Sequence, residues 1–146
     1  MKTLERVLNI EEFNIFRSVN SDLTKEDIKM MNPLSLAFVG DAVFEIFIRT
    51  EILGKGRKNS NKLHIESSKL VNNKAQAEFL RRIEKELTAD ERAVVKRGIN
   101  SKNHTIPKNA DVHTYKEATG LEALFGYLYL LGEDGRILDL YRRGLK

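Results

Sequence analysis

An apolar stretch from Leu34 to Leu53 limits the folds open to this chain more than any other segment. Asn32-Pro33 precedes it and Gly54-Lys55-Gly56 follows it, and such residues often mark the beginning and the end of a helix. The pattern predicts one long helix with more apolar residues than a single buried face requires. One carboxylate, Asp41, lies in the middle of the run, and an ionised aspartate is rarely buried without a cation or hydrogen-bond donors. The sequence therefore predicts a partner for Asp41, and a metal ion is one candidate.

The rest of the chain also predicts helices. Residues of high helix propensity dominate the 146 residues, and proline occurs only at Pro33 and Pro107, so the composition favours an all-α protein. We expect one domain over residues 1–146, with residues 1–31 as an N-terminal helical extension and residues 32–131 as its core. Apolar spacing and capping residues predict helices over residues 4–19, 60–71, 74–87, 113–131 and 137–141, a short capped turn at 24–27, a helix beginning at Thr88 and a loop over 97–111.

Several classes of protein are excluded by composition. Cysteine is absent, which rules out disulfides, thiolate metal sites and cysteine nucleophiles. No apolar run approaches the roughly 20 residues that span a bilayer, and the acidic N-terminal segment does not resemble a signal peptide. We therefore expect a cytoplasmic protein without membrane contact.

A second carboxylate, Glu122, lies inside the apolar run of residues 121–129. Two packed helices that each present one carboxylate would form a site with oxygen ligands, which suit a hard cation such as Mg²⁺ or Mn²⁺. Pairing of either carboxylate with Arg49, Lys74 or Arg136 is an alternative that the spacing leaves open. Glu45, one helical turn after Asp41, could instead face solvent.

The segment from Arg92 to Ala110 contains no acidic residue, whereas the whole chain carries a net charge of only +4. Its lysines and arginines can neutralise phosphate charge, and its asparagines can donate hydrogen bonds to phosphate or ribose. We predict RNA contacts at Lys96, Arg97, Asn100, Lys102, Lys108 and Asn109, with an ordinary solvated loop as the alternative.

Two short motifs resemble those of the ribonuclease III endonuclease domain. Residues 36–41, Leu-Ala-Phe-Val-Gly-Asp, are similar to its signature segment, and residues 122–126, Glu-Ala-Leu-Phe-Gly, are similar to its second carboxylate motif. The resemblance spans Asn32 to Leu131 and departs from the family at Ala37 and Thr119, where carboxylates are usual. Few residues follow Leu131, so we expect no double-stranded-RNA-binding domain, as in the Mini-ribonuclease III branch.

This resemblance implies an all-α helical bundle that forms a homodimer and cleaves double-stranded RNA with Mg²⁺, or alternatively with Mn²⁺. Asp41 and Glu122 would be the catalytic, metal-binding carboxylates, and the two departures leave the number of ions open. The branch implies a substrate in the precursor of large-subunit (23S) ribosomal RNA. The alternative is a catalytically idle RNA-binding or scaffolding dimer that has lost its chemistry with the missing carboxylates.

Overall fold

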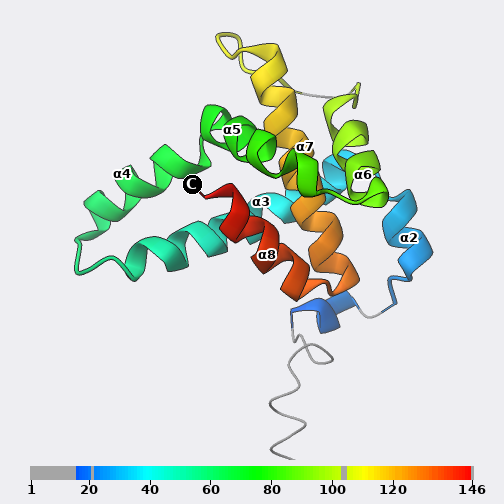
Figure 1. Cartoon of the computed structure of the whole chain (residues 1–146), viewed down its shortest axis with the longest axis horizontal. Coiled ribbons are helices and arrows are strands. Elements are labelled where there is room, and N and C mark those ends of the chain that lie inside the picture. The colour runs from blue at the N-terminus through cyan, green and yellow to red at the C-terminus, as the bar shows by residue number, and fades with distance from the viewer. Residues whose placement is uncertain (1–15, 21, 103–104, 146) are drawn as a thin grey trace, which may run out of the picture.

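The structure, a computed structural model, describes residues 16–20, 22–102 and 105–145, and every regular element in these ranges is helical (Figure 1). The all-α prediction is confirmed. The elements are η1 (Arg17–Asn20), α2 (Lys25–Met30), α3 (Pro33–Leu53), α4 (Ser60–Val71), α5 (Asn73–Ile83), η2 (Glu84–Glu86), α6 (Ala89–Ile99), α7 (Val112–Leu131) and α8 (Asp134–Gly144), where η denotes a 3₁₀ helix. Most of the helix predicted over residues 4–19 lies outside the described residues. No helix in the described part of the chain combines the length and apolarity needed to cross a bilayer.

Helix α7 lies at the centre of the fold, and α3, α5 and α6 pack around it (Figure 1). Its residues 117–121 and 123–128 are buried, which is typical of a helix enclosed on every side. The aromatic ring of Phe44 on α3 meets the rings of Phe79 on α5 and Phe125 on α7 edge to face, with centroids 5.2 and 5.3 Å apart. These contacts fix the three helices against one another.

Helix α3 has two apolar faces, and only one of them is covered. Leu36, Gly40 and Phe44, spaced four residues apart, lie buried against the core. On the other face, Phe38 is 83% exposed and Ile46 is 66% exposed. The sequence therefore predicted the apolar surplus of this helix correctly, and the structure places the surplus on the molecular surface.

The helix beginnings follow the predicted capping residues. Thr24 and Thr88 each form a capping box with the acidic residue three positions later. Asn32 accepts a hydrogen bond from the backbone N–H of Leu34, and Pro33 occupies the first helical position. These bonds close within a few residues, so the local sequence is sufficient to determine them.

Three helices have bounds that differ from the prediction. The helix predicted over residues 74–87 ends at Ile83, and a 3₁₀ turn follows, because Arg92 donates hydrogen bonds to the carbonyls of Glu84 and Lys85 at 3.2 and 3.4 Å. Helix α6 extends to Ile99, into the predicted loop, because its last turn packs on α7. The terminal helix is also longer than predicted and spans Asp134–Gly144.

An ion pair joins the beginning of α6 to α8. Glu91 is buried, its side chain accepts a hydrogen bond from the backbone N–H of Thr88, and Arg136 donates two more at 2.8 and 2.9 Å. Burial raises the pKa of Glu91, but the hydrogen bonds from Arg136 and Thr88 outweigh that effect, so the net pKa lies below its usual range.

Replacement of Glu91 by glutamine should lower the free energy of unfolding by about 2–3 kcal/mol, because it removes the buried one of the two carboxylates that pair with Arg136 and leaves only the more exposed Asp139. The pKa of Glu91 is lowered in the folded state, so its contribution is present above the unfolded-state pKa and is lost as the pH falls through the folded-state value. Urea unfolding at pH 7 and in acid measures both effects. Asp90→Asn, at an exposed acid in the same turn, is the matched control. If Glu91→Gln lowers the free energy of unfolding by the same amount at pH 7 and in acid, this pH dependence is contradicted.

Candidate active site

Helices α3 and α7 touch backbone to backbone at Gly40 and Gly126. A Cβ atom on Gly40 would overlap the carbonyl oxygen of Glu122, and one on Gly126 would overlap the carbonyl oxygen of Leu36. Only glycine at both positions allows the helices to approach this closely. Since Asp41 directly follows Gly40, the crossing places Asp41 beside Glu122.

The two carboxylates open into one surface pocket. Its volume is about 420 Å³, and its lining is Leu34, Ala37, Phe38, Asp41, Asn73, Thr105, Tyr115, Thr119 and Glu122. The side chains of Asp41 and Glu122 lie within hydrogen-bonding reach of each other. The structure therefore brings together the two carboxylates that the sequence motifs paired.

Their burial is the reverse of the expectation drawn from the apolar run. Asp41 is exposed at the rim of the pocket, because it lies one residue beyond the buried Gly40 and is turned about 100° around the helix from it. Glu122 is the half-buried member. Burial, together with the hydrogen bond and negative charge of Asp41, raises the pKa of Glu122 to about 8.

The cations proposed as alternative partners do not neutralise this pair. The guanidinium of Arg49 lies 2.7 Å from the carboxylate of Glu45, and the guanidinium of Arg136 pairs with the carboxylates of Glu91 and Asp139. Within the described ranges, no salt bridge reaches either Asp41 or Glu122. Glu45 lies outside the pocket, is partly buried rather than solvent-facing, and pairs with Arg49 one turn along its own helix.

This donor set fits a hard divalent cation. Two carboxylates meet at a pocket whose other polar groups, among them Asn73 and Thr119, are neutral. No cluster of three or more metal-ligating acids, histidines or cysteines occurs in the described part of the chain. An ion bound by Asp41 and Glu122 would therefore keep mostly water in its shell, which Mg²⁺ tolerates well.

Comparison with known proteins identifies this arrangement. The ribonuclease III domain model matches residues 34–133. This chain belongs to the ribonuclease III family. It is 47% identical over 125 residues to Mini-ribonuclease 3 of Clostridium tetani, covering 85% of this chain and 83% of that protein. It is 48% identical over 118 residues to Mini-ribonuclease 3 of a Thermoanaerobacter species, covering 81% of this chain and 83% of that protein.

A solved structure supports the same fold. The crystal structure of a protein from Fusobacterium nucleatum is similar, with a TM-score of 0.70 and 37% sequence identity, and the alignment covers 76% of this chain and 90% of that one. The resemblance to the Mini-ribonuclease III branch is confirmed, and the chain is an endoribonuclease of the ribonuclease III family.

Nothing acidic replaces the two carboxylates that ribonuclease III enzymes usually carry beside this pair. Ala37 and Thr119 both line the pocket and both are buried. The hydroxyl of Thr119 donates to the backbone carbonyl of Tyr115 at 3.1 Å, so it is directed along its own helix. Asp41 and Glu122 are therefore the two carboxylates that line this pocket.

Gln76 belongs to the site but was not predicted from the sequence. This residue lies on α5 and is only 2% exposed, and its side-chain amide is close enough to Glu122 to lower the pKa of that carboxyl against the opposing effect of burial. A signal was present, because Gln76, Phe79, Leu80 and Ile83 share one face by helical spacing. A glutamine on a face otherwise occupied by buried apolar residues needs a polar partner.

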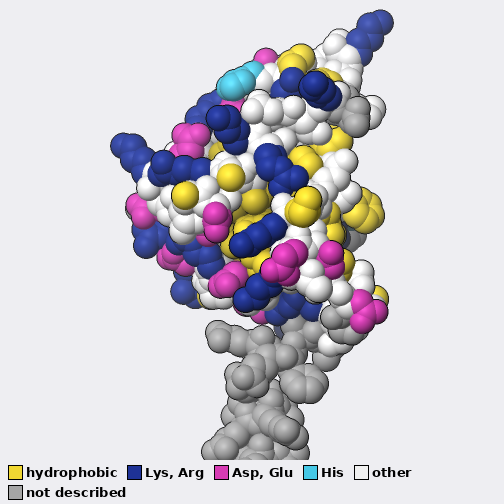
Figure 2. Space-filling model, turned by 90° about the vertical axis from the view of Figure 1, so that its right-hand side faces the viewer, with side chains coloured by type: hydrophobic (Ala, Val, Ile, Leu, Met, Phe, Trp, Pro, Cys, Tyr) yellow, Lys and Arg dark blue, Asp and Glu magenta, His cyan; other side chains and the backbone are white. Residues whose placement is uncertain are grey.

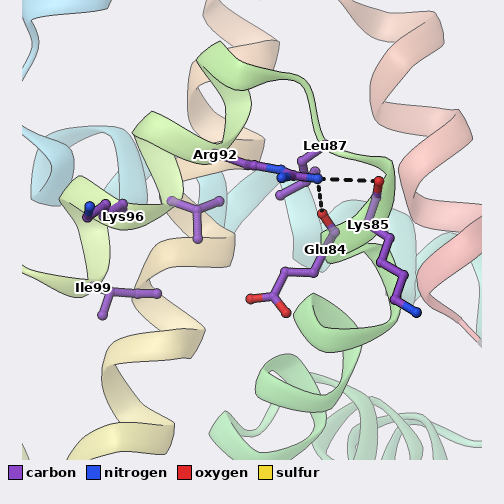
Figure 3. A pocket seen from close by; sticks show the side chains of 7 residues that line it. Glu84, Lys85, Leu87, Arg92, Lys96 and Ile99 are labelled. Atoms are coloured by element: carbon purple, nitrogen blue, oxygen red, sulfur yellow. Dashed lines mark hydrogen bonds between the residues drawn. The ribbon is translucent and has the colours of Figure 1, made fainter.

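The six residues predicted to contact RNA lie in different surroundings. Arg97 donates to the carbonyls of Lys29 and Met31 at 3.0 and 2.9 Å, which ties α6 to the segment before α3. Figure 2, seen from the right-hand side of Figure 1, shows lysines and arginines interspersed with hydrophobic and acidic side chains. Lys96 lines a groove between η2 and α6, together with Lys85 and Ile99 (Figure 3).

The remaining four are exposed and lie near the loop that reaches the pocket. Asn100 and Lys102 follow α6, and Lys108 and Asn109 precede α7. Thr105, in the same loop, lines the pocket of Asp41 and Glu122. This loop is the part of the basic segment that reaches the carboxylates.

Proposed function

We propose that this chain is a Mg²⁺-dependent endoribonuclease that cleaves double-stranded RNA and matures the precursor of 23S ribosomal RNA. The observation that carries the proposal is the meeting of Asp41 and Glu122 in a pocket where no cationic side chain of the described residues neutralises them. Mg²⁺ held there would lower the pKa of a bound water and stabilise charge on the scissile phosphate.

The two carboxylates have different roles in this proposal. Asp41, at the exposed rim, can reach the ion while a phosphate approaches from solvent. Glu122 is anchored in the wall of the pocket and holds the ion from the protein side. The neutral Asn73 and Thr119 do not repel an approaching phosphate, unlike additional carboxylates.

The exposed apolar face of α3 supports a homodimer in this proposal. Phe38 and Ile46 point away from the core, with the exposed Ala42 between them. A second copy of the chain would remove these side chains from water. Since Phe38 also lines the carboxylate pocket, the interface would adjoin both sites, and two sites are needed to cut two strands.

The experiment is incubation of the protein with a labelled RNA duplex, its separate single strands and a 23S precursor transcript, with Mg²⁺, with Mn²⁺ or with chelator. We expect cuts in both strands of the duplex, cuts in the precursor and none with chelator. Because Ala37 and Thr119 replace acids, a catalytically idle RNA-binding dimer is the second candidate. Binding of the duplex without cleavage in either metal would establish it instead.

The loop before α7 should supply phosphate contacts. The double variant Lys102→Ala with Lys108→Ala should weaken duplex binding, and the slope of log affinity against log salt should decrease by about 1 for each phosphate that the protein no longer neutralises. Binding titrations between low and moderate salt measure this slope. Lys25→Ala with Lys29→Ala removes the same charge from the exposed surface of α2 and is the control. Equal weakening in both double variants would mean that net charge alone, rather than the loop, determines binding.

A further inference from the structure

Gln76 is a buried polar residue that the proposed chemistry does not yet use. Gln76 is 2% exposed, and its helix, α5, packs directly on α7. The preceding Asn72 caps α5 by accepting a hydrogen bond from the backbone N–H of Ala75 at 2.9 Å. The side-chain amide of Asn72 also donates to the carbonyls of Ser68 and Lys69 at the end of α4. Hydrogen bonds of Asn72 therefore join the first turn of α5 to the end of α4, which defines the position of Gln76.

The side chain of Gln76 reaches Glu122 across the contact between α5 and α7. Two residues of the pocket wall do not take this role. The Thr119 hydroxyl donates to Tyr115, and the side chain of Ala37 has no polar atom. Gln76 follows Asn73 by one helical turn on α5, and Asn73 lines the same pocket as Glu122. Among the described residues, the amide of Gln76 is the neutral side-chain group that lowers the pKa of Glu122, and a half-buried carboxylate needs such a donor.

We propose that Gln76 is a positioning residue, whose side-chain amide holds the carboxylate of Glu122 directed at Asp41 in the geometry that binds the metal ion. This inference rests on the proposed role of Asp41 and Glu122 as metal ligands. Hydrogen bonds that orient a metal-binding carboxylate affect ion affinity even though they never touch the ion.

The neutrality of the amide matters as much as its hydrogen bond. An arginine or lysine in its place would pair with Glu122 and compete with the cation for the carboxylate. An amide N–H satisfies one oxygen of the carboxylate and leaves the negative charge available. Gln76 therefore orients Glu122 in a site where the positions of Ala37 and Thr119 offer no further carboxylate to share that task.

The test measures Mn²⁺ binding to the RNA-free protein by calorimetry, together with kcat and KM on an RNA duplex. Gln76→Met has nearly the same length and packing but no donor, and Gln76→Asn keeps the amide but is too short to reach Glu122. We expect Mn²⁺ binding to weaken by about 10- to 100-fold in both variants, with a comparable fall in kcat and an unchanged KM. One variant is apolar and the other keeps an amide, so the test can still be made if one of the two proteins does not fold.

Ser67→Ala is the matched control. Ser67 is another buried polar residue, and its hydroxyl donates to the carbonyl of His64 on α4, apart from the pocket. Its replacement should leave Mn²⁺ affinity and kcat unchanged. The inference is overturned if Gln76→Met lowers only the melting temperature and binds Mn²⁺ as the parent does. If the parent's Mn²⁺ binding is insensitive to Asp41→Asn, the metal role of the carboxylate pair fails, and this inference fails with it.

Discussion

Asp41→Asn should reduce cleavage of double-stranded RNA by on the order of 10³-fold while duplex binding survives. The substitution keeps the size of the side chain and removes the charge that a divalent cation needs. Glu122 alone, half-buried beside the neutral Thr119, would then be the remaining carboxylate of the pocket. Single-turnover cleavage and duplex binding, measured on the same preparation, separate loss of chemistry from loss of RNA affinity.

Glu45→Gln is the matched control for Asp41→Asn. Glu45 lies one turn further along α3, but its carboxylate pairs with Arg49 outside the pocket. This variant should cleave as the parent does. Cleavage by Asp41→Asn at the parental rate would remove Asp41 from the proposed site, and an equal decrease in Glu45→Gln would indicate a general effect of charge on α3.

Asp41→Asn should also stabilise the metal-free protein, because it relieves repulsion between two neighbouring carboxylates. In the folded state the pKa of Glu122 is raised to about 8, so the folded protein holds a proton there that the unfolded chain releases near its ordinary pKa. The resulting stability is present in acid and is lost as the pH rises through 8. Thermal unfolding in chelator should therefore show a gain for Asp41→Asn at pH 8 and none at pH 4. Added Mg²⁺ should stabilise the parent and not the variant.

Gly126→Ala should cause a large loss of stability. The new Cβ would overlap the backbone carbonyl oxygen of Leu36, and a backbone atom cannot rotate away as a side chain can. Overpacking in a core typically costs about 1–3 kcal/mol, and we expect about 3 kcal/mol or more here because the new Cβ meets backbone atoms of α3. Any protein that still folds must separate α3 from α7, which moves Asp41 away from Glu122. The cleavage rate should therefore fall by more than the loss of folded protein explains.

Gly135→Ala is the control for this prediction, because a Cβ at Gly135 meets no atom within 4 Å. In the first turn of α8, alanine should be neutral or slightly stabilising. Chemical unfolding and duplex cleavage compare the two variants directly. A Gly126→Ala protein with parental stability and activity would show that the helix crossing does not determine the site.

The helical elements were largely predictable because their signals are local. The capping boxes at Thr24 and Thr88, and the Asn32-Pro33 beginning of α3, close their hydrogen bonds within three residues. The end of α5 was not predictable in this way. At that end Arg92 of α6 donates hydrogen bonds to the carbonyls of Glu84 and Lys85, which precede it by eight and seven positions.

The candidate site was predictable in part for the same reason. Both carboxylates stand in short motifs, so their pairing could be inferred from the sequence, and the structure brings them together. Arg97 shows the limit of such local patterns. Its charge in a basic segment suggested phosphate, whereas its guanidinium bonds to the carbonyls of Lys29 and Met31, more than sixty positions earlier in the chain. Its predicted RNA contact remains a prediction.

The sequence by itself determined where the capped helices α2, α3 and α6 begin, that α3 has more apolar residues than its core contact uses, and which two carboxylates stand in paired motifs. Only the tertiary structure decided which of the two is buried, that the unused face of α3 is on the surface, and that Gln76 reaches Glu122. The physical reason is the range of the interactions. Caps and periodicity depend on neighbours within one or two turns, whereas burial and the crossing at Gly40 and Gly126 depend on helices that meet only when the chain has folded.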